Sequence, residues 1–476
     1  MADLPPLFKC QEECLDRMKD EDSWAVLCEM GTGKSRVIVE DWIRRPDLNL
    51  LIVAPKGCYL NWYKEFDLYL SKEQRDTILI RHWVANASTK EFSNVKAILR
   101  QWPKFRRILL INIEALSGSK SVKSFLELFL TSGPAMMVID ESTRIKTYNS
   151  QRTKAILSLA PLAPVKRILT GLVAPNSPMD LFSQFQFLDW RILGYKNFFT
   201  FKSRYAVLQK TFFGSRSFDQ IIGYQNIDEL QEKIARKSYR ALKKDYLSLP
   251  PKIFTERSVE LSSIQEKIYK DLKKDTMSIL DGGEYVSASL ALSLLMKLHQ
   301  VTVGHVSDDQ GRLQLINATP REEELMSILE ETEGKAIIWA HFRPTLLRLR
   351  SLIQKRYGEQ SLVEFWGDTS VKDREIAKDR FQNDDTCRWF LGNQSSGGIG
   401  NTLTKANVII YYSNSFNLEH RSQSEDRVHR AGLDHSVLII DLIAKGTIDE
   451  KVINALKDKI NLAASITGES ARDWLR

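Results

Sequence analysis

The chain has 476 residues, of which 43% are hydrophobic and 27% are charged, and its formal net charge is +8. This composition is typical of a globular protein, and the length suits two to four domains of about 150 residues each. No apolar run approaches the roughly 20 residues of a membrane helix, and the five cysteines form no Cys-x-x-Cys pair, which indicates buried reduced thiols rather than a metal cluster.

Short apolar runs alternate with helical patterns along most of the chain. The runs are rich in β-branched residues and apolar at successive positions, which is typical of strands covered on both faces. Strands are predicted over 50–54, 108–113, 136–139, 167–169, 336–339, 408–412 and 437–442, and helices over 57–70, 150–160 and 343–356. Such alternation predicts an α/β fold with parallel sheets built from right-handed crossovers.

The alternation stops between residues 180 and 330, where the chain becomes helical and basic. Residues 191–260 hold 14 Lys and Arg against 7 Asp and Glu, which suits either a polyanion-binding surface or a solvated basic helix face. Pro250 and Pro251 interrupt regular structure and mark a domain boundary. We expect a first lobe over 1–248, with a helical basic protrusion over about 190–245, and a second lobe over 249–476, with a helical insertion over about 263–330.

A candidate phosphate-binding loop occupies residues 28–35, between a predicted strand and a predicted helix. It matches the template G-x-x-x-x-G-K-[ST], with Cys28 at the position of the first glycine. Glycines let the backbone N–H groups of Met30, Gly31, Thr32 and Gly33 turn toward phosphates. Lys34 is expected to contact the β and γ phosphates and Ser35 to ligate Mg²⁺. The loop therefore predicts ATP and Mg²⁺ as cofactors.

An acidic pair, Asp140 and Glu141, follows the predicted strand 136–139, about 105 residues after the loop. In an α/β pattern this spacing matches one known ATPase arrangement. We expect Asp140 to hold the Mg²⁺ shell and Glu141 to orient and polarise the attacking water.

Further motifs follow in order along nearly the whole chain. They are Ile52–Pro55 with Asn61–Phe66, Asp140–Lys146, Leu169–Gly171 with Asn176, Leu249–Lys252, Gly397–Thr404, Gln423–Gly432 and Gly446–Glu450. This set resembles the Swi/Snf-like DNA translocases of helicase superfamily two, in particular compact stand-alone members from phage or bacteria. The resemblance implies two RecA-like lobes in tandem with helical insertions, and ATP hydrolysis coupled to movement along double-stranded DNA without extensive strand separation.

The chain departs from the family pattern at several positions. Cys28 replaces a small residue, Thr143 replaces a histidine, Leu172-Val173-Ala174 replaces Thr-Pro-Ile, and Ser413–Leu418 differs from Asp-x-x-Trp-Asn-Pro. The phosphate chemistry does not depend on these positions, so they bear on the coupling of hydrolysis to movement.

The resemblance also assigns nucleotide contacts outside the loop. Gln11 is expected to contact the adenine edge, because an amide offers a donor and an acceptor together. Arg427 and Arg430, three residues apart, resemble the arginine fingers that stabilise charge on the γ phosphate. Gly400 and Gln423 are expected to line the same cleft.

Contacts to DNA are expected at phosphates, which carry no sequence information, so binding is predicted to be sequence-independent. The candidates are Lys56, Thr170, Gly171, Ser396, Gly397 and Gly398. Lys233, Arg236, Lys237 and Arg240 fall at helical spacing and are predicted to present one basic face beside the DNA. Trp62 and Trp366 are expected in the core rather than in contact with bases.

Two other functions fit parts of this pattern. One is a strand-separating DNA or RNA helicase, which would need a wedge element that the sequence does not identify. The other is a weakly catalytic DNA-binding scaffold of a larger assembly, against which Lys34, Asp140, Glu141 and Arg430 argue. The first six residues lack a basic start and an apolar stretch, so we expect no secretory signal. We expect a monomer in the cytoplasm of a bacterial or phage-infected cell rather than in a nucleus.

Overall fold

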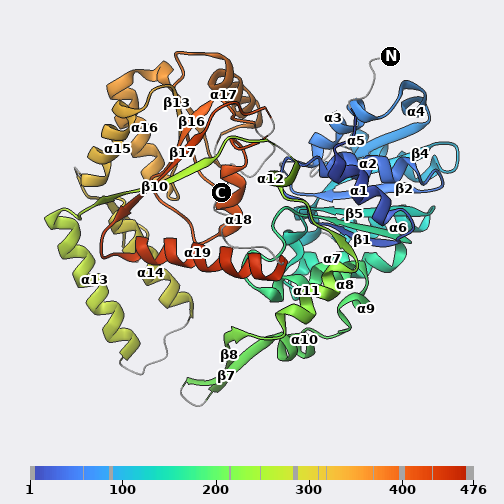
Figure 1. Cartoon of the computed structure of the whole chain (residues 1–476), viewed down its shortest axis with the longest axis horizontal. Helices are drawn as coiled ribbons and strands as arrows, with labels where there is room; N and C mark the ends of the chain where they lie inside the picture. Colours follow the sequence, from blue (N-terminus) through green and yellow to red (C-terminus); the bar gives the residue numbers. More distant parts are fainter. Residues whose placement is uncertain are drawn as a thin grey trace. The chain divides into compact units, whose positions relative to one another are not determined.

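The structure is a computed structural model that describes residues 6–56, 58–84, 89–118, 120–213, 216–246, 248–281, 288–308, 310–317, 319–367, 369–395, 402–430 and 432–467. The chain divides into two compact units. One is built mainly from the residues up to Ser248 and the other mainly from Leu249 to Asn461 (Figure 1).

A seven-stranded sheet with the order β3-β4-β2-β5-β6-β1-β9 forms the centre of the first unit, and its pairings are parallel. The strands are β1 (Ser23–Val26), β2 (Asn49–Ala54), β3 (Ile78–His82), β4 (Arg106–Asn112), β5 (Ala135–Asp140), β6 (Val165–Leu169) and β9 (Ser238–Tyr239). Strands β2 and β5 are apolar and buried at nearly every position, as expected for central strands of a parallel sheet. Because parallel strands end at one edge, the segments after β1, β2, β5 and β6 share that edge.

Helices cover the sheet of the first unit (Figure 1). The helices of this unit are α1 (Lys9–Met18), α2 (Lys34–Ile43), α3 (Trp62–Tyr69), α4 (Lys72–Asp76), α5 (Thr89–Ala97), α6 (Lys120–Thr131), α7 (Gln151–Leu159), α8 (Leu181–Leu188), α9 (Trp190–Leu193), α10 (Phe198–Tyr205), α11 (Ile227–Ala235) and α12 (Lys243–Tyr246). The helix predicted over 57–70 begins with a 3-10 turn, Tyr59–Asn61, before α3.

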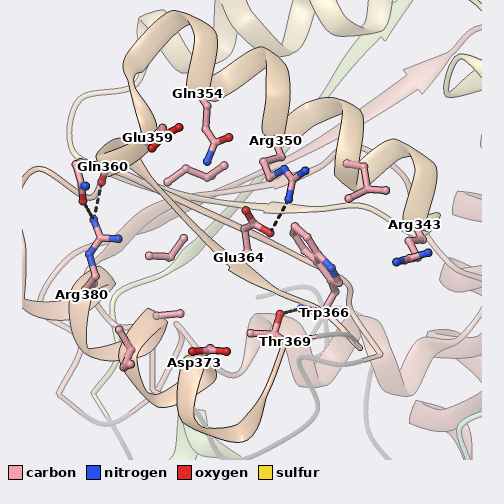
Figure 2. A pocket seen from close by; sticks show the side chains of 15 residues that line it. Arg343, Arg350, Gln354, Glu359, Gln360, Glu364, Trp366, Thr369, Asp373 and Arg380 are labelled. Atoms are coloured by element: carbon pink, nitrogen blue, oxygen red, sulfur yellow. Dashed lines mark hydrogen bonds and ion pairs between the residues drawn. The ribbon is translucent and has the colours of Figure 1, made fainter.

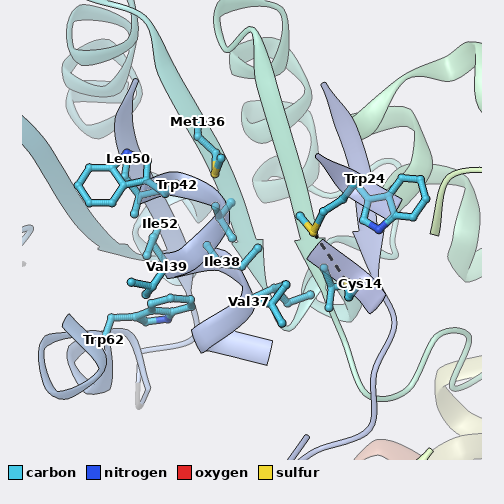
Figure 3. Close-up of a cluster of buried hydrophobic side chains, with 14 of the residues drawn as sticks. Cys14, Trp24, Val37, Ile38, Val39, Trp42, Leu50, Ile52, Trp62 and Met136 are labelled. Atoms are coloured by element: carbon cyan, nitrogen blue, oxygen red, sulfur yellow. Dashed lines mark hydrogen bonds between the residues drawn. The ribbon is translucent and has the colours of Figure 1, made fainter. Parts of the chain in front are cut away.

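Helix α2 carries an apolar face into the core of the first unit. Val37, Ile38, Val39 and Trp42 are buried against strand residues that include Leu50, Ile52 and Met136 (Figure 3). Each buried side chain of this size contributes roughly 1.5–3 kcal/mol of transfer free energy. This packing fixes the start of α2, and with it the end of the phosphate loop, against the sheet.

The protrusion predicted as helical over about 190–245 is helical only in part. Besides helices, the segment contains a separate two-stranded sheet, β7 (Ala206–Phe213) and β8 (Arg216–Tyr224). Both strands carry β-branched and aromatic side chains, among them Val207, Thr211, Ile221 and Tyr224, and such residues favour strands over helices.

The second unit contains a six-stranded parallel sheet with the order β10-β17-β16-β13-β15-β14. Its strands are β10 (Lys252–Val259), β13 (Lys335–Trp339), β14 (Leu362–Phe365), β15 (Trp389–Gly392), β16 (Ala406–Tyr411) and β17 (Val437–Ala444). The helices are α13 (Ser263–Asp281), α14 (Ala288–Thr302), α15 (Pro320–Glu331), α16 (Arg343–Tyr357), α17 (Val371–Asn383), α18 (Leu418–Glu425) and α19 (Ile448–Thr467).

Successive residues of β13 enter two different cores. Ala336 and Ile338 belong to one apolar cluster and Ile337 and Trp339 to another, so apolar side chains cover both faces of this sheet. The predicted fold of two parallel-sheet α/β lobes is confirmed.

The insertion expected to be helical over about 263–330 also contains an antiparallel pair of short strands, β11 (His305–Ser307) and β12 (Leu313–Leu315). Gly311, at φ +76°, lies in the turn between them. Among the described residues, no helix combines the length and the apolar character that crossing a bilayer requires.

Candidate nucleotide site

The predicted phosphate loop connects β1 to α2 in the first unit. Gly31 and Gly33 both have left-handed backbones, with φ of +90° and +78°. Side chains other than glycine are strained in that region. A Cβ atom on Gly33 would also lie 2.1 Å from Gln11 Nε2. Both glycines are therefore required by the loop conformation itself.

The side chain of Lys34 turns back onto the loop. Its Nζ donates to the Glu29 carbonyl oxygen at 3.2 Å, and Thr32 Oγ1 donates to the same oxygen at 2.8 Å. A phosphate would compete with this carbonyl for the ammonium group, because a charged acceptor makes the stronger hydrogen bond. Ser35 follows in the first turn of α2, where backbone N–H groups have no partner within the helix.

Gln11 lies beneath the loop and is 3% exposed. Its Nε2 donates to the carbonyl oxygens of Thr32 and Gly33, both at 3.2 Å. Its Oε1 accepts from the Phe8 N–H at 2.9 Å. The amide thus supports the loop backbone in this structure, and its contact with adenine stays a prediction.

The acidic pair lies where β5 ends. Asp140 Oδ1 accepts from the backbone N–H of Glu141 at 2.9 Å, and Asp140 Oδ2 accepts from Trp62 Nε1 at 3.1 Å. Burial raises the pKa of the Asp140 carboxyl, and the Lys34 ammonium and the Trp62 hydrogen bond act in the opposite direction. Glu141 has a left-handed backbone, φ +48°, a strained conformation of the kind that clusters at functional sites.

These groups fit a magnesium ion. Mg²⁺ is held by one or two carboxylates together with phosphate oxygens and waters. Asp140 supplies a half-buried carboxylate close enough to Lys34 for their charges to interact. No group of three or more His, Cys, Asp or Glu suited to a metal occurs in the part of the chain that the structure describes.

The segment after β6 packs directly on the phosphate loop. A Cβ atom on Gly171 would lie 3.2 Å from the Met30 backbone nitrogen. Thr170 is fully buried, and its hydroxyl donates to the Leu172 carbonyl and accepts from the Leu172 N–H. The Thr170 hydroxyl is therefore used inside the unit, and a contact of Thr170 and Gly171 with DNA stays a prediction.

Two buried side chains connect the acidic pair to this segment. Ser142 Oγ donates to Gln184 Oε1 at 2.6 Å, and Gln184 Nε2 donates to the carbonyl oxygens of Val173 and Asp180. The sequence did not indicate Gln184, because it lies 42 residues from Ser142 and outside the quoted motifs.

A segment that we call the connector, residues 237–252, leads from the first unit into the second. Its first part runs beside β1 and the phosphate loop. The N–H groups of Ala25, Leu27 and Glu29 donate to the carbonyl oxygens of Lys237, Tyr239 and Ala241 at 2.9–3.0 Å. Glu29 Oε2 accepts from the Lys243 N–H at 2.7 Å, and Glu13 Oε2 accepts from the Tyr246 hydroxyl at 3.1 Å.

Arg240, which was predicted to contact DNA, joins two parts of the nucleotide site. Its Nη1 donates to the Leu27 carbonyl at 2.6 Å and to the Gly171 carbonyl at 3.0 Å. One guanidinium thus holds the strand end before the phosphate loop and the segment after β6.

The single basic helix face predicted for Lys233, Arg236, Lys237 and Arg240 is wrong, because α11 ends at Ala235. Lys233 Nζ donates to the Leu193 carbonyl at 3.0 Å and pairs with Glu229 at 2.8 Å, and Lys237 pairs with Glu21. Arg236 is exposed.

Lys56, two residues after the end of β2, is also exposed, and its backbone N–H donates to Glu114 Oε2 at 2.9 Å.

The second unit positions the two predicted arginine fingers after α18. Arg427 is 4% exposed, and its Nε and Nη1 have no hydrogen-bond partner among the residues that the structure describes. Burial lowers the pKa of its guanidinium to about 9. Gln423 is also buried, and its Oε1 has no partner within the same described residues. Ser396, Gly397, Gly398 and Gly400 lie outside the described residues.

A buried ionic network holds the chain before Arg427. Arg421 makes a two-pronged contact with Asp441 at 2.6 and 3.0 Å, and its Nε donates to Glu425 at 2.7 Å. The end of the connector joins this network, because Lys252 Nζ donates to Glu425 Oε2 at 3.0 Å. His429 Nε2 lies 2.8 Å from the Pro250 carbonyl oxygen.

A pocket of about 630 Å³ opens on the second unit between α16, β14 and α17 (Figure 2). Its walls carry Arg343, Arg350 and Arg380 beside acidic side chains, and Arg350 pairs with Glu364 at 3.5 Å. None of the predicted nucleotide residues lines it, so it is separate from the site described above.

Comparisons with known proteins identify two domains in the chain. Residues 13–304 match the SNF2-related domain, and residues 320–432 match the helicase conserved C-terminal domain.

Curated relatives match over nearly the whole chain. The CHD3-type chromatin-remodeling factor CHR7 of Arabidopsis thaliana is 26% identical, over 93% of this chain and 35% of its own length. An uncharacterised ATP-dependent helicase of Mycoplasma genitalium is 26% identical, over 91% and 39%. The human DNA annealing helicase and endonuclease ZRANB3 is 23% identical, over 92% and 38%. The chain therefore spans less than half the length of these relatives.

Among solved structures, the SWI2/SNF2 ATPase core of Sulfolobus solfataricus in complex with double-stranded DNA matches 99% of this chain and 96% of its own. The sequence identity is 22% and the TM-score is 0.43.

Proposed function

The chain belongs to the SNF2-related family, and we propose that it is an ATP-dependent translocase on double-stranded DNA. It would track along DNA, or remodel protein–DNA complexes, without extensive strand separation.

In this proposal the first unit binds the nucleotide. Lys34 leaves the Glu29 carbonyl for the β and γ phosphates, and the backbone N–H groups of the loop and of α2 surround them. Ser35 and Asp140 hold Mg²⁺, which when bound neutralises charge on the phosphate oxygens. Glu141 orients and polarises the attacking water.

The second unit supplies the arginines. Arg427 is the main support for this role. Its guanidinium is buried, and two of its nitrogens have no hydrogen-bond partner among the described residues, so hydrogen bonds to an incoming phosphate would stabilise it strongly. We propose that Arg427 and Arg430 reach the γ phosphate when the two units close on ATP. ATP binding would then select one arrangement of the units and hydrolysis would release it.

The DNA partner is supported by the family and by the human relative, which is named a DNA annealing helicase and endonuclease. The net charge of +8 is compatible with a polyanionic partner. The Mycoplasma relative supports our expectation of a bacterial cytoplasmic setting, in which the chain would act as a monomer.

A comparison of activators tests the proposal. Magnesium-dependent ATPase activity is measured with duplex DNA, single-stranded DNA, forked DNA and RNA, and we expect duplex DNA to stimulate it several-fold. In parallel, ATP should drive release of the third strand from a DNA triplex while a forked duplex stays annealed. The variant Glu141→Gln serves as the inactive control in both assays.

The two rival functions predict different results. Robust unwinding of forked duplex DNA or of RNA would show that the chain is a strand-separating helicase and not a translocase. If the wild-type chain binds DNA but hydrolyses no ATP, the DNA-binding scaffold is the better description of its function.

A further inference from the structure

Trp62 lies in the core of the first unit, and the partner of its indole N–H is a carboxylate. The side chain is 2% exposed, on the first turn of α3, and its indole Nε1 donates to Asp140 Oδ2 at 3.1 Å. The two residues lie 78 positions apart in the chain. The other carboxylate oxygen, Oδ1, accepts from the Glu141 N–H. Both oxygens of Asp140 are therefore held, one by the adjacent backbone and one by this indole.

The surroundings of Trp62 fix the direction of its N–H group. The indole belongs to the same apolar cluster as Val39 and Ile52 (Figure 3). Its ring lies 6.0 Å from that of Phe66, centroid to centroid, at an interplanar angle of 37°. An indole packed in this way has little freedom to turn, so its donor is already oriented toward the carboxylate.

The chemistry of the pair goes beyond packing. An indole has one donor and no acceptor, so it can bond a carboxylate but cannot itself ligate a metal ion. Groups that hydrogen-bond a metal ligand set its orientation, and their loss typically weakens metal binding by about 10–100-fold. A buried indole N–H needs an acceptor, and in Trp62 that acceptor is the carboxylate expected to hold the metal rather than a backbone carbonyl.

We propose that Trp62 is a positioning residue that orients the Asp140 carboxylate for Mg²⁺. This inference rests on the proposed nucleotide site but not on DNA translocation. Trp62 was expected from the sequence only as a core aromatic, because nothing in its position indicates a partner so far along the chain.

The first unit offers a matched control for this role. Trp42 is equally buried, belongs to the same apolar cluster, and its indole Nε1 donates to the Leu48 carbonyl at 2.8 Å. Trp62→Phe and Trp42→Phe therefore each remove one buried indole hydrogen bond and similar ring volume. Only the first change removes a donor from Asp140.

The test measures the affinity for ADP, by calorimetry, in EDTA and in saturating Mg²⁺ for the wild type and both variants. The ratio of the two affinities reports the coupling between metal and nucleotide. We expect Trp62→Phe to reduce that ratio by about ten-fold, with ADP affinity in EDTA unchanged, and Trp42→Phe to keep the wild-type ratio. The Mg²⁺ concentration for half-maximal ATPase activity should rise in Trp62→Phe alone.

The outcomes separate this proposal from the proposed function. A wild-type ratio in Trp62→Phe, or an equal reduction in Trp42→Phe, overturns the positioning role and leaves the nucleotide site intact. No binding of ADP to the wild-type chain overturns the site itself. If Trp62→Phe does not fold, the wild type answers the same question by ¹⁵N-indole spectroscopy. The resonance of the Trp62 indole N–H is identified by the contact of this ring with Phe66. It must shift when Mg²⁺ is added to the ADP complex, and a resonance that does not shift overturns the proposal.

Discussion

Ser142 Oγ lies 2.6 Å from Gln184 Oε1, and both side chains are almost completely buried. The bond joins the residue after the acidic pair to helix α8, whose Gln184 amide also holds the carbonyl oxygens of Val173 and Asp180. A movement of the acidic pair would therefore be transmitted through Gln184 to the segment between β6 and α8.

We expect Ser142 and Gln184 to be energetically coupled. Ser142→Ala leaves the Gln184 Oε1 acceptor without its donor. Gln184→Leu leaves the Ser142 hydroxyl without its acceptor and two carbonyl oxygens without their donor. Each group left unpaired costs about 1–3 kcal/mol. A double-mutant cycle followed by urea unfolding should give a coupling free energy of roughly 0.5–3 kcal/mol. Strictly additive losses would show that the bond does not contribute.

Lys34→Ala and Glu141→Gln should abolish ATP turnover for different reasons. The first removes the charge expected at the β and γ phosphates, whereas the second removes only the carboxylate expected to polarise water. Glu141→Gln should therefore still bind ATP, as measured by calorimetry. Glu127→Gln, at a partly exposed position of α6 where the carboxylate pairs with Lys123, is a matched control that should keep full activity. Normal turnover in either test variant contradicts the site.

Arg427→Ala and Arg430→Ala should lower turnover much more than ATP affinity, because finger residues act mainly on the transition state. Arg427→Ala should cost little stability, since its Nε and Nη1 have no partner among the described residues. The control Arg421→Ala breaks a buried ion pair with Asp441 and should cost about 3–5 kcal/mol. Equal losses of stability in Arg427→Ala and Arg421→Ala would disprove the distinction.

Stability of the second unit should fall in mild acid. Burial lowers the pKa of His299 to about 4, with Asp449 opposing and His341 and Arg321 reinforcing the shift, and burial likewise lowers the pKa of His305 to about 4. In the unfolded chain a histidine takes up its proton near pH 6.5. Below that pH the unfolded state binds more protons, so stability present at pH 7 is lost as pH falls toward 4.

Each of these two histidines should cost on the order of 2 kcal/mol between pH 7 and pH 5. Denaturant unfolding at the two pH values measures the loss, and His305→Phe, which keeps a ring beside Phe342, should remove about half of it. An unchanged loss in His305→Phe would show that other groups control acid sensitivity.

The basic residues predicted to contact DNA differ in their surroundings: Arg236 is exposed, whereas Lys233 is bonded within the first unit. Arg236→Ala should flatten the slope of log DNA affinity against log salt by about 0.9 if Arg236 contacts one phosphate. Lys233→Ala should instead lower stability, because Lys233 holds the Leu193 carbonyl and Glu229. If the slope of log DNA affinity against log salt is unchanged in Arg236→Ala, Arg236 does not contact DNA.

The fold could be predicted from the sequence because its signals are local. Strands such as β2 and β5 are short continuous apolar runs, and the glycines of the phosphate loop follow a fixed spacing. The resemblance to Swi/Snf-like proteins is confirmed by the SNF2-related and helicase C-terminal domains.

The remaining features depend on contacts between distant residues. Helical spacing suggested that Arg240 shares a face with Lys233, but α11 ends first and β9 pairs with β1, which turns Arg240 toward Gly171. Trp62 and Gln184 could not be assigned for the same reason, because their partners lie 78 and 42 residues away. Such partners become visible only in three dimensions.

Both flanks of the connector are bonded within their own units. Residues up to Tyr246 are held to the phosphate loop and to α1, and the chain from Pro250 onward is held by His429, Glu425 and β17. Pro250 and Pro251, at the start of the second flank, hold φ at about −65° and donate no backbone hydrogen bond. The chain therefore enters the second unit with little torsional freedom, which helps to keep Lys252 in place for its contact with Glu425.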